Sequence, residues 1–566
     1  MKKRKTIGAV ALIFTLSLLS SCGQKSSGDD VHNDAPASDT SVSETSASVT
    51  DAPEVGTQES AENGEDAENG GINAIFGDVR TEFNTSLDLS EFPLTSSDVP
   101  EGYSFLIEAE SGTFSGSVKS QERPGASGDA FVTGINNAEK DRLDLNFTAE
   151  YTGFYDLDFQ TSGSSDDRVN DVLVDDMKVG DMLNTTVGQA FGSSKVYNIY
   201  MEAGEHTISV VPSWGYIDID CLYVTAPQLP LDESVYAVKR ELSNPNADDR
   251  TKRLYKFLCD IYGKYSLAGQ YADKGRESGE FNKITAKTGK SFAVLGLDVS
   301  NYSLGSIEHG ADSRTVEYAY DFYTNGGGIV QLCWHWTSPG KYAKNDEGNP
   351  WYRSFYKEAS NIELDKIMNG EDEEGYKLLM DDIDHMSGEL ARLRDAGVPV
   401  LWRPLHEASG GWFWWGNCSA ESYKKLWNVM YDKMTNEHGL TNLIWVWNGQ
   451  SPEWYPGDET VDIHGWDIYA GKRVDSSQSG RFTDMAYNFG EKKLIALTEN
   501  GCVMDPDKVM RDNARWLFWG TWSDPFTMKM GVVINDEYTD TELLIKAYNH
   551  ERVLTLDELP DLKNYE

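Results

Sequence analysis

Positive charge is scarce in this sequence. Its 566 residues include 50 lysines and arginines against 92 aspartates and glutamates, a formal net charge of −42 at pH 7. Nucleic acids and anionic membrane surfaces would repel such a chain, so we exclude both as partners. A neutral polysaccharide is indifferent to this charge. Aromatic residues, in contrast, make up 11% of the chain, and the apolar face of a pyranose stacks on aromatic rings.

Cysteines are few, and long apolar runs are missing. The six cysteines form no Cys-x-x-Cys pair, and the five that follow Cys22 are an odd number, so we expect mostly buried thiols. The apolar stretch 7–19 is shorter than the roughly 20 residues of a membrane-spanning helix. It lies between a basic start and Leu19-Ser20-Ser21-Cys22, which resembles the lipobox of bacterial lipoproteins. We therefore predict a signal peptide over residues 1–22 and a lipid on Cys22 that anchors the chain, outside the cytoplasm, to the bacterial cell envelope. A plain signal peptide is the alternative.

Large apolar residues are also nearly absent between residues 23 and 71. Ser, Thr, Asp, Glu, Ala and Gly dominate this segment, and its charge is strongly acidic. Such a segment cannot bury enough surface to offset its chain entropy. We predict a disordered acidic tether over residues 23–100, of which 72–100 form a transition to the folded part.

The remaining length predicts two folded domains. Over residues 101–228, short alternating runs such as 155–159 and 207–211 are separated by glycine-containing turns, which is typical of a β-sandwich. From residue 232, apolar strand-like runs such as 443–447 alternate with segments of helical periodicity such as 378–396. We predict a (β/α)8 TIM barrel over residues 232–566. An open doubly wound sheet is the alternative, but no glycine-rich phosphate loop follows an early strand.

The ends of the predicted barrel strands carry the polar and aromatic residues. In a β/α barrel, the loops at the carboxyl ends of the strands hold the chemistry. Strands three, four, six, seven and eight end, in that order, in Trp334-His335-Trp336, Arg403-Pro404-Leu405-His406-Glu407, Trp466-Asp467-Ile468-Tyr469, Thr498-Glu499-Asn500 and Trp519-Gly520-Thr521-Trp522.

Two glutamates, Glu407 and Glu499, thus end strands four and seven. Cleavage of a glycosidic bond needs one carboxyl to protonate the leaving oxygen and a second carboxylate to attack the anomeric carbon or activate water. The two roles need opposite pKa values, because burial keeps one carboxyl protonated while a cation or hydroxyl donor keeps the other ionised. The pair predicts glycoside hydrolysis.

Residues 240–560 resemble glycoside hydrolase family 26. The resemblance rests on residues 402–407, the aromatic residues 411–416 that follow them, Thr498-Glu499-Asn500 and the closing residues 553–560. It implies an endo-β-1,4-mannanase, because most characterised members of that family have this activity. An enzyme of this kind needs no cofactor for catalysis.

The resemblance also implies a role for individual positions. Glu407 is similar to the acid/base of the family and Glu499 to its nucleophile. The substrate-binding set implied around them consists of His335 and Trp522 at the sugar before the cut, Trp412 at the sugar after it, His406 near the scissile bond, and Tyr469 and Arg403 beside Glu499. For each of these six residues, packing within the barrel rim is the structural alternative.

The sandwich resembles family 35 carbohydrate-binding modules. The similarity lies in Ile107-Glu108-Ala109-Glu110 at its start and in residues 213–220 at its end. It implies that Glu108, Glu110 and Asp220 hold a structural calcium ion, for which carboxylates are suitable ligands, and that Trp214 stacks on a sugar. Charged turns and an interior tryptophan are the alternatives.

The sequence therefore predicts a retaining endo-β-1,4-mannanase acting on mannan, glucomannan or galactomannan. Two alternatives stay open. One is a β-glucanase or β-1,3-xylanase of the same fold, since loops rather than the glutamates select the sugar. The other is a non-catalytic glycan-binding lipoprotein that keeps the barrel as a platform.

Overall fold

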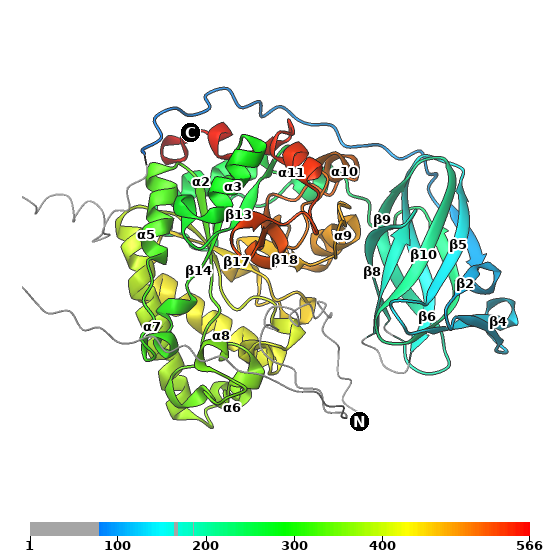
Figure 1. Cartoon of the computed structure of the whole chain (residues 1–566), viewed down its shortest axis with the longest axis horizontal. Helices are drawn as coiled ribbons and strands as arrows, with labels where there is room; N and C mark the ends of the chain where they lie inside the picture. The colour runs from blue at the N-terminus through cyan, green and yellow to red at the C-terminus, as the bar shows by residue number, and fades with distance from the viewer. Residues whose placement is uncertain (1–77, 164–167, 185) are drawn as a thin grey trace, which may run out of the picture.

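The computed structural model describes residues 78–163, 168–184 and 186–566. An all-β domain and an α/β barrel lie side by side in it (Figure 1). The predicted signal peptide with Cys22, and the tether as far as residue 77, lie outside the described residues. Over the described ranges, none of the helices combines the length and apolar character needed to cross a membrane.

The first domain is the predicted antiparallel sandwich. One sheet has the order β3-β4-β11-β6-β9 with β1 paired to β11, and the other has the order β2-β5-β10-β7-β8. Leu145, Leu157, Ile208 and Leu222 are fully buried in the core of this domain. The strands are β1 (Ser104–Glu108), β2 (Thr113–Ser115), β3 (Lys119–Glu122), β4 (Ala130–Ile135), β5 (Arg142–Ala149), β6 (Gly153–Gly163), β7 (Arg168–Val174), β8 (Met177–Asn184), β9 (Gly192–Met201), β10 (Gly204–Trp214) and β11 (Ile217–Thr225).

The second domain is the predicted TIM barrel. Eight parallel strands close into a ring, in which the last strand pairs with the first. They are β13 (Gly269–Tyr271), β14 (Val294–Asp298), β15 (Ile329–Cys333), β16 (Val400–Arg403), β17 (Leu443–Trp447), β18 (Ile463–Ile468), β19 (Leu494–Asn500) and β20 (Trp519–Thr521). Two short pairs lie outside the ring: β12 (Ser266–Leu267) with β23 (Val553–Leu554), and β21 (Met528–Lys529) with β22 (Val533–Ile534).

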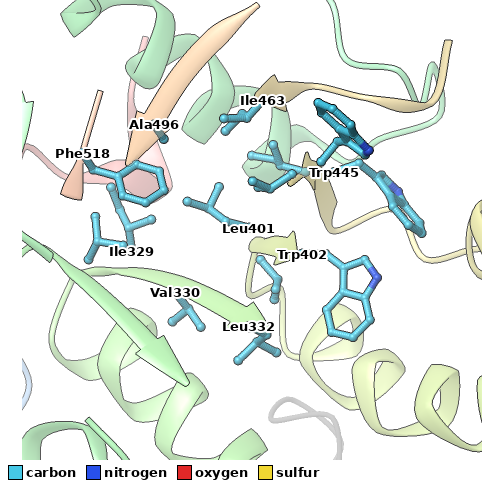
Figure 2. Close-up of a cluster of buried hydrophobic side chains, with 14 of the residues drawn as sticks. Ile329, Val330, Leu332, Leu401, Trp402, Trp445, Ile463, Ala496 and Phe518 are labelled. Carbon is cyan, nitrogen blue, oxygen red and sulfur yellow. The ribbon is translucent and has the colours of Figure 1, made fainter. Parts of the chain in front are cut away.

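The barrel strands are apolar on both faces because the helices cover the outside and side chains fill the inside. Figure 2 shows this core, where Ile329 and Leu332 of β15 lie with Leu401 of β16 and Ile463 of β18. Continuous apolar runs, rather than alternating ones, are what a strand buried on both faces requires.

Helices cover the outside of the barrel (Figure 1). The longest, α7, buries Leu379, Ile383, Met386 and Leu390 at three- and four-residue spacing, the pattern of a helix with one apolar face. The helices are α2 (Asp249–Ile261), α3 (Gly279–Thr288), α4 (Leu304–Ile307), α5 (Thr315–Tyr320), α6 (Leu364–Met368), α7 (Glu373–Asp395), α8 (Ala420–Asp432), α9 (Ser479–Asn488), α10 (Pro506–Arg511) and α11 (Thr541–Tyr548). The cysteines behave as predicted: the five in the described residues are free thiols, and all except Cys418 are buried.

The segment 78–100 differs from the predicted tether. It runs along the barrel before it enters the sandwich (Figure 1). Arg80 donates hydrogen bonds to the carbonyl oxygens of Asp557 and Leu559 at 3.0 and 2.9 Å. The buried Arg515 donates to the carbonyl oxygens of residues 92 and 93 at 2.8 and 2.7 Å. The tether therefore cannot extend to residue 100, because this segment carries apolar residues that pack on the barrel core, namely Leu87, Leu89 and Phe92.

The sandwich packs against helix α9 of the barrel (Figure 1). The contact is made by β9 and β8. On β9, Asn198 adopts a left-handed φ of 54° and donates a hydrogen bond to Thr483 Oγ1 at 2.9 Å. Ser479 Oγ in turn donates to the Asn198 carbonyl oxygen at 2.9 Å. These side-chain hydrogen bonds fix how the two domains sit against each other.

Candidate active site

Glu407 follows the fourth barrel strand in an unusual backbone conformation. Leu405 and Glu407 have φ values of 51° and 52°, in the left-handed region that residues other than glycine seldom adopt. Two hydrogen bonds hold this turn against the loop after β17: Glu407 N donates to Asn448 O at 2.7 Å, and Ser409 N donates to Gly449 O at 3.1 Å. Strain of this kind persists where the surroundings fix the backbone, and it is common at active sites.

Three carboxyl groups meet at the mouth of the barrel. Glu407, Asp467 and Glu499 each place an oxygen within 4.8 Å of the others. They come from the ends of β16, β18 and β19, so the barrel brings together residues separated by up to 92 positions in the sequence. Glu407 and Glu499 are 9% and 4% exposed, which leaves each carboxyl mostly shielded from bulk water.

Arg403 and Tyr469 hold Glu499. The fully buried guanidinium of Arg403 forms ion pairs with Glu499 and with Asp467, the latter at 2.8 Å. It also donates to the Tyr271 hydroxyl at 3.0 Å. The Tyr469 hydroxyl donates to Glu499 Oε2 at 2.5 Å, the length of a charge-assisted hydrogen bond. Both neighbours stabilise the ionised form of Glu499, in the positions that the sequence predicted for them.

Glu407 has a different environment. Its Oε2 accepts one hydrogen bond, from Trp412 Nε1 at 2.9 Å. Burial raises the pKa of Glu407 well above its ordinary value, and the negative charges of Asp467 and Glu499 raise it further. Arg403 and Trp412 lower this pKa, but they do not outweigh the burial.

Glu499 also has a raised pKa, which differs from the simple expectation of an ordinary ionised carboxylate. Burial raises its pKa to about 7, although Arg403, His335 and the Tyr469 hydroxyl all lower it. Because the two carboxyls interact, their protons belong to the pair. Glu499 has the cation and the hydroxyl donor, so when the pair holds one proton we assign that proton to Glu407.

Two histidines form a chain behind the carboxyl groups. His335 Nδ1 lies 2.8 Å from Asp298 Oδ2, and His335 Nε2 lies 3.2 Å from His406 Nε2. His406 is 1% exposed and packs against Phe413 and Trp415. Burial, followed by the charges of Arg403 and His335, lowers the pKa of His406 well below its ordinary value. A neutral His406 can therefore orient His335, which is the more accessible of the two.

Two partly exposed indole rings, those of Trp412 and Trp522, belong to the site. Trp522 follows β20, and its ring centroid is 4.6 Å from that of Tyr271 and 5.9 Å from that of His335. Trp412 follows Glu407 and holds it through Nε1. Since both rings keep exposed area, both can stack on a sugar. The structure thus brings together all eight barrel residues that the sequence predicted for the site.

Several residues of the site were not assigned from the sequence. Asp467 accepts hydrogen bonds from Arg403 and from Thr498 Oγ1, the latter at 2.7 Å. Asp298 holds His335, and Tyr271 accepts from Arg403. Asp298 is the last residue of β14 and Asp467 the last but one of β18, so the strand-end rule that found the glutamates was the signal for both.

Two groups of side chains at the site carry atoms of the kinds that ligate metal ions. Asp298, Cys333 and His335 place ligand atoms within 4.8 Å of one another, but burial raises the pKa of the Cys333 thiol well above its ordinary value. A protonated thiol is a poor metal ligand. In the second group, that of the three carboxylates, the single positive charge of the Arg403 guanidinium is shared between Asp467 and Glu499, with which it forms ion pairs.

The sandwich has its own acidic cluster. Ser127 Oγ donates to Glu108 Oε1 at 2.7 Å, and Ser127 N donates to Asp220 Oδ1 at 2.9 Å. Glu108 Oε2 and Glu110 Oε2 are buried without a hydrogen-bond partner. Burial and the charges of both glutamates raise the pKa of Asp220. Unpartnered buried carboxylate oxygens fit a hard cation such as calcium. Trp214 ends β10, but its side chain lies outside the described residues.

Comparison with known proteins identifies the family of the chain. The profile of glycosyl hydrolase family 26 matches residues 243–558, which is more than half of the chain. The chain belongs to glycosyl hydrolase family 26. It is therefore a glycoside hydrolase, and the profile of carbohydrate binding module family 35 matches residues 105–226 of the sandwich.

Relatives of this family 26 enzyme match it over about four fifths of the chain. A mannan endo-1,4-β-mannosidase of Thermothelomyces thermophilus is 36% identical over 461 residues, 81% of this chain and 91% of that protein. A mannan endo-1,4-β-mannosidase A of Piromyces sp is 32% identical and covers 80% of this chain and 72% of that protein. The crystal structure of a Podospora anserina GH26-CBM35 β-(1,4)-mannanase, 33% identical, superposes with a TM-score of 0.56 over 82% of this chain and all of that one.

Proposed function

We propose that this enzyme is a retaining endo-β-1,4-mannanase that hydrolyses mannan, glucomannan or galactomannan. The observation that carries the mechanism is the approach of Glu407 and Glu499, whose carboxylate oxygens lie within 4.8 Å of each other. Retaining glycosidases place their two carboxyl groups about 5–5.5 Å apart, whereas inverting enzymes need about 6.5–9.5 Å to admit a water molecule. The mannan substrate is supported by the named activities of the relatives.

The proposed reaction has two steps. Glu499 attacks the anomeric carbon while Glu407 gives its proton to the leaving oxygen, so the glycosidic bond breaks and a glycosyl–Glu499 ester forms. Glu407, now ionised, then takes a proton from water, and the water oxygen attacks the anomeric carbon and releases Glu499. Arg403 and Tyr469 orient Glu499 in both steps, and no cofactor takes part.

Reducing-sugar release from galactomannan tests the assignment. We expect the wild type to be active and Glu407→Ala and Glu499→Ala each to lose activity by several orders of magnitude, because each step needs both groups. Activity near the wild-type level in either variant would contradict the mechanism. A panel of β-mannans, β-glucans and β-xylans separates the mannanase from a β-glucanase or β-1,3-xylanase, and a wild type inactive on all of them would favour the glycan-binding platform.

For the sandwich we propose a structural calcium ion and a sugar ligand. Glu108, Glu110 and Asp220 would hold the ion, supported by the two unpartnered buried oxygens, and Trp214 would stack on the sugar. Calorimetric titration with calcium and with mannohexaose tests both. The absence of calcium binding would refute the metal site, and unchanged sugar affinity in Trp214→Ala would refute the stacking role.

We also propose that the chain is a lipoprotein of the bacterial cell envelope, anchored outside the cytoplasm through Cys22. The basic start, the short apolar stretch and Leu19-Ser20-Ser21-Cys22 support this. Radioactive palmitate should label the full-length chain expressed in a bacterium, and Cys22→Ser should abolish the label. Equal labelling of both chains would contradict the anchor.

A further inference from the structure

A pocket joins the active site to the sandwich. From the barrel it is lined by Glu407, by residues 466–470 at the end of β18, and by Gly480 and Arg481 of α9. From the sandwich it is lined by Lys178 of β8 and by Tyr197 of β9, among others. The carbohydrate-binding domain thus reaches a catalytic glutamate of the neighbouring domain.

Close backbone contact holds the sandwich in this position. A Cβ added to Gly480 of α9 would lie 3.2 Å from Val196 Cγ1 and 3.4 Å from the Tyr197 backbone nitrogen and oxygen. Asn198, next to Tyr197, donates a hydrogen bond to Thr483 Oγ1 and accepts one from Ser479 Oγ, both on the same helix. The position of Tyr197 beside the pocket is therefore fixed by the same contacts that join the two domains.

The pocket borders the proposed acid/base, Glu407, and Tyr469, whose hydroxyl donates to Glu499 Oε2, lines it as well. Of the two catalytic glutamates in the described part of the chain, Glu407 lines it, and Glu407 is the group that protonates the leaving oxygen in the proposed mechanism. His335 and Trp522, which lie beside each other near Glu499, are not among the described residues that line it. A polysaccharide that enters this pocket would extend from the leaving oxygen towards the sandwich.

The lining suits a neutral sugar. Tyr197 is half-buried and keeps part of its side chain accessible, which suits stacking on a pyranose. At the sandwich end, Lys178 is paired with Asp171 at 3.0 Å and with Asp181 at 2.7 Å. Arg481 is paired with Asp484 at 3.2 Å, and its guanidinium carbon lies 4.6 Å from the Trp466 ring centroid. Paired charges of this kind offer hydrogen bonds to hydroxyl groups without attracting an ionic ligand.

We propose that the sandwich forms a wall of the catalytic cleft, in which Tyr197 contacts a sugar unit of the leaving chain and so selects longer β-1,4-linked hexose chains. This inference rests on the proposed function. It gives β9 a part in substrate selection that is separate from the sugar site predicted at Trp214, which lies on β10.

The test compares two substrates in the full chain. Mannohexaose can occupy the leaving-group side with several sugars, whereas an aryl β-mannobioside carries only a small aromatic leaving group. We expect Tyr197→Ala to lower the ratio of kcat/KM for mannohexaose to kcat/KM for the aryl mannobioside by about tenfold, as for the loss of one ring contact. Cleavage positions in mannohexaose labelled at its reducing end should shift in the same variant.

Tyr200→Ala is the matched control. Tyr200 is on the same strand and packs against Arg511 of the barrel, with 4.5 Å between the guanidinium carbon and the ring centroid, but it does not line the pocket. We expect this variant to keep the substrate ratio and the cleavage positions. An unchanged ratio and pattern in an active Tyr197→Ala enzyme, or the same change in Tyr200→Ala, would overturn the sandwich wall. A wild type that cleaves neither substrate would refute the proposed function instead.

Discussion

Replacement of Tyr469 by phenylalanine tests how the protein keeps Glu499, the proposed nucleophile, ionised. The substitution removes only the hydroxyl that donates to Glu499 Oε2 at 2.5 Å and leaves the ring, which packs on Phe526 with 4.9 Å between the ring centroids. Hydrogen bonds to charged groups contribute about 1.5–3 kcal/mol. This contribution favours the ionised form of Glu499, so its loss changes the protonation equilibrium.

The sign of the effect follows from the pKa of Glu499. Burial already raises this pKa to about 7, and the Tyr469 hydroxyl lowers it. Without the hydroxyl, the pKa rises further. Since one pKa unit corresponds to about 1.36 kcal/mol, the acidic limb of the kcat/KM profile should move up by about one unit or more. At pH 6 the ionised fraction, and with it kcat/KM, should fall by about tenfold.

The assay is kcat/KM for an aryl β-mannobioside between about pH 4 and pH 9, since the limbs of this profile report the free enzyme. Tyr548→Phe is the control, because Tyr548 is a buried tyrosine of α11 outside the site. An acidic limb that stays in place in Tyr469→Phe, or that moves to lower pH, would refute the assignment of Glu499 as the group that must be ionised.

Three further outcomes follow from the structure. Trp412→Phe removes a hydrogen bond that lowers the pKa of Glu407. The basic limb of the kcat/KM profile should therefore move to higher pH, and kcat should fall. A basic limb that moves to lower pH would contradict this. Calcium should raise the Tm of the sandwich in the wild type and not in Glu108→Ala, as calorimetry with and without chelator can check. Arg515→Ala leaves the carbonyls of residues 92, 93 and 263 without their donor. It should lower the free energy of unfolding, measured by urea titration, by about 3 kcal/mol. A loss below about 0.5 kcal/mol would mean that Arg515 does not hold the segment 78–100 on the barrel.

The positions of the two glutamates could be predicted from the sequence because both end apolar strands. In a closed parallel barrel all such ends lie at one rim, so the order of strands along the chain is enough to place Glu407 near Glu499. The same argument placed Tyr469, His335 and Trp522. Asp467 ends a strand too, but its role depends on the guanidinium of Arg403, 64 positions away, and no local pattern encodes that pairing.

Contacts between distant surfaces could not be predicted. The segment 78–100 has no regular periodicity, and only the barrel surface that accepts Leu87, Leu89 and Phe92 explains why it is ordered. The docking of the sandwich brings β9 so close to Gly480 of α9 that an added Cβ would lie 3.2 Å from Val196 Cγ1. A single glycine at the start of a helix carries no signal of this kind in the sequence.

The anomeric configuration of the first product tests the central claim most directly, namely that Glu407 and Glu499 act as acid and nucleophile across a short gap. Proton NMR can follow mannohexaose hydrolysis in its first minutes, before the product mutarotates. Two displacements at the anomeric carbon predict that the β-anomer of the new reducing end appears first. First appearance of the α-anomer would mean a single displacement by water, and it would contradict the roles given to this pair.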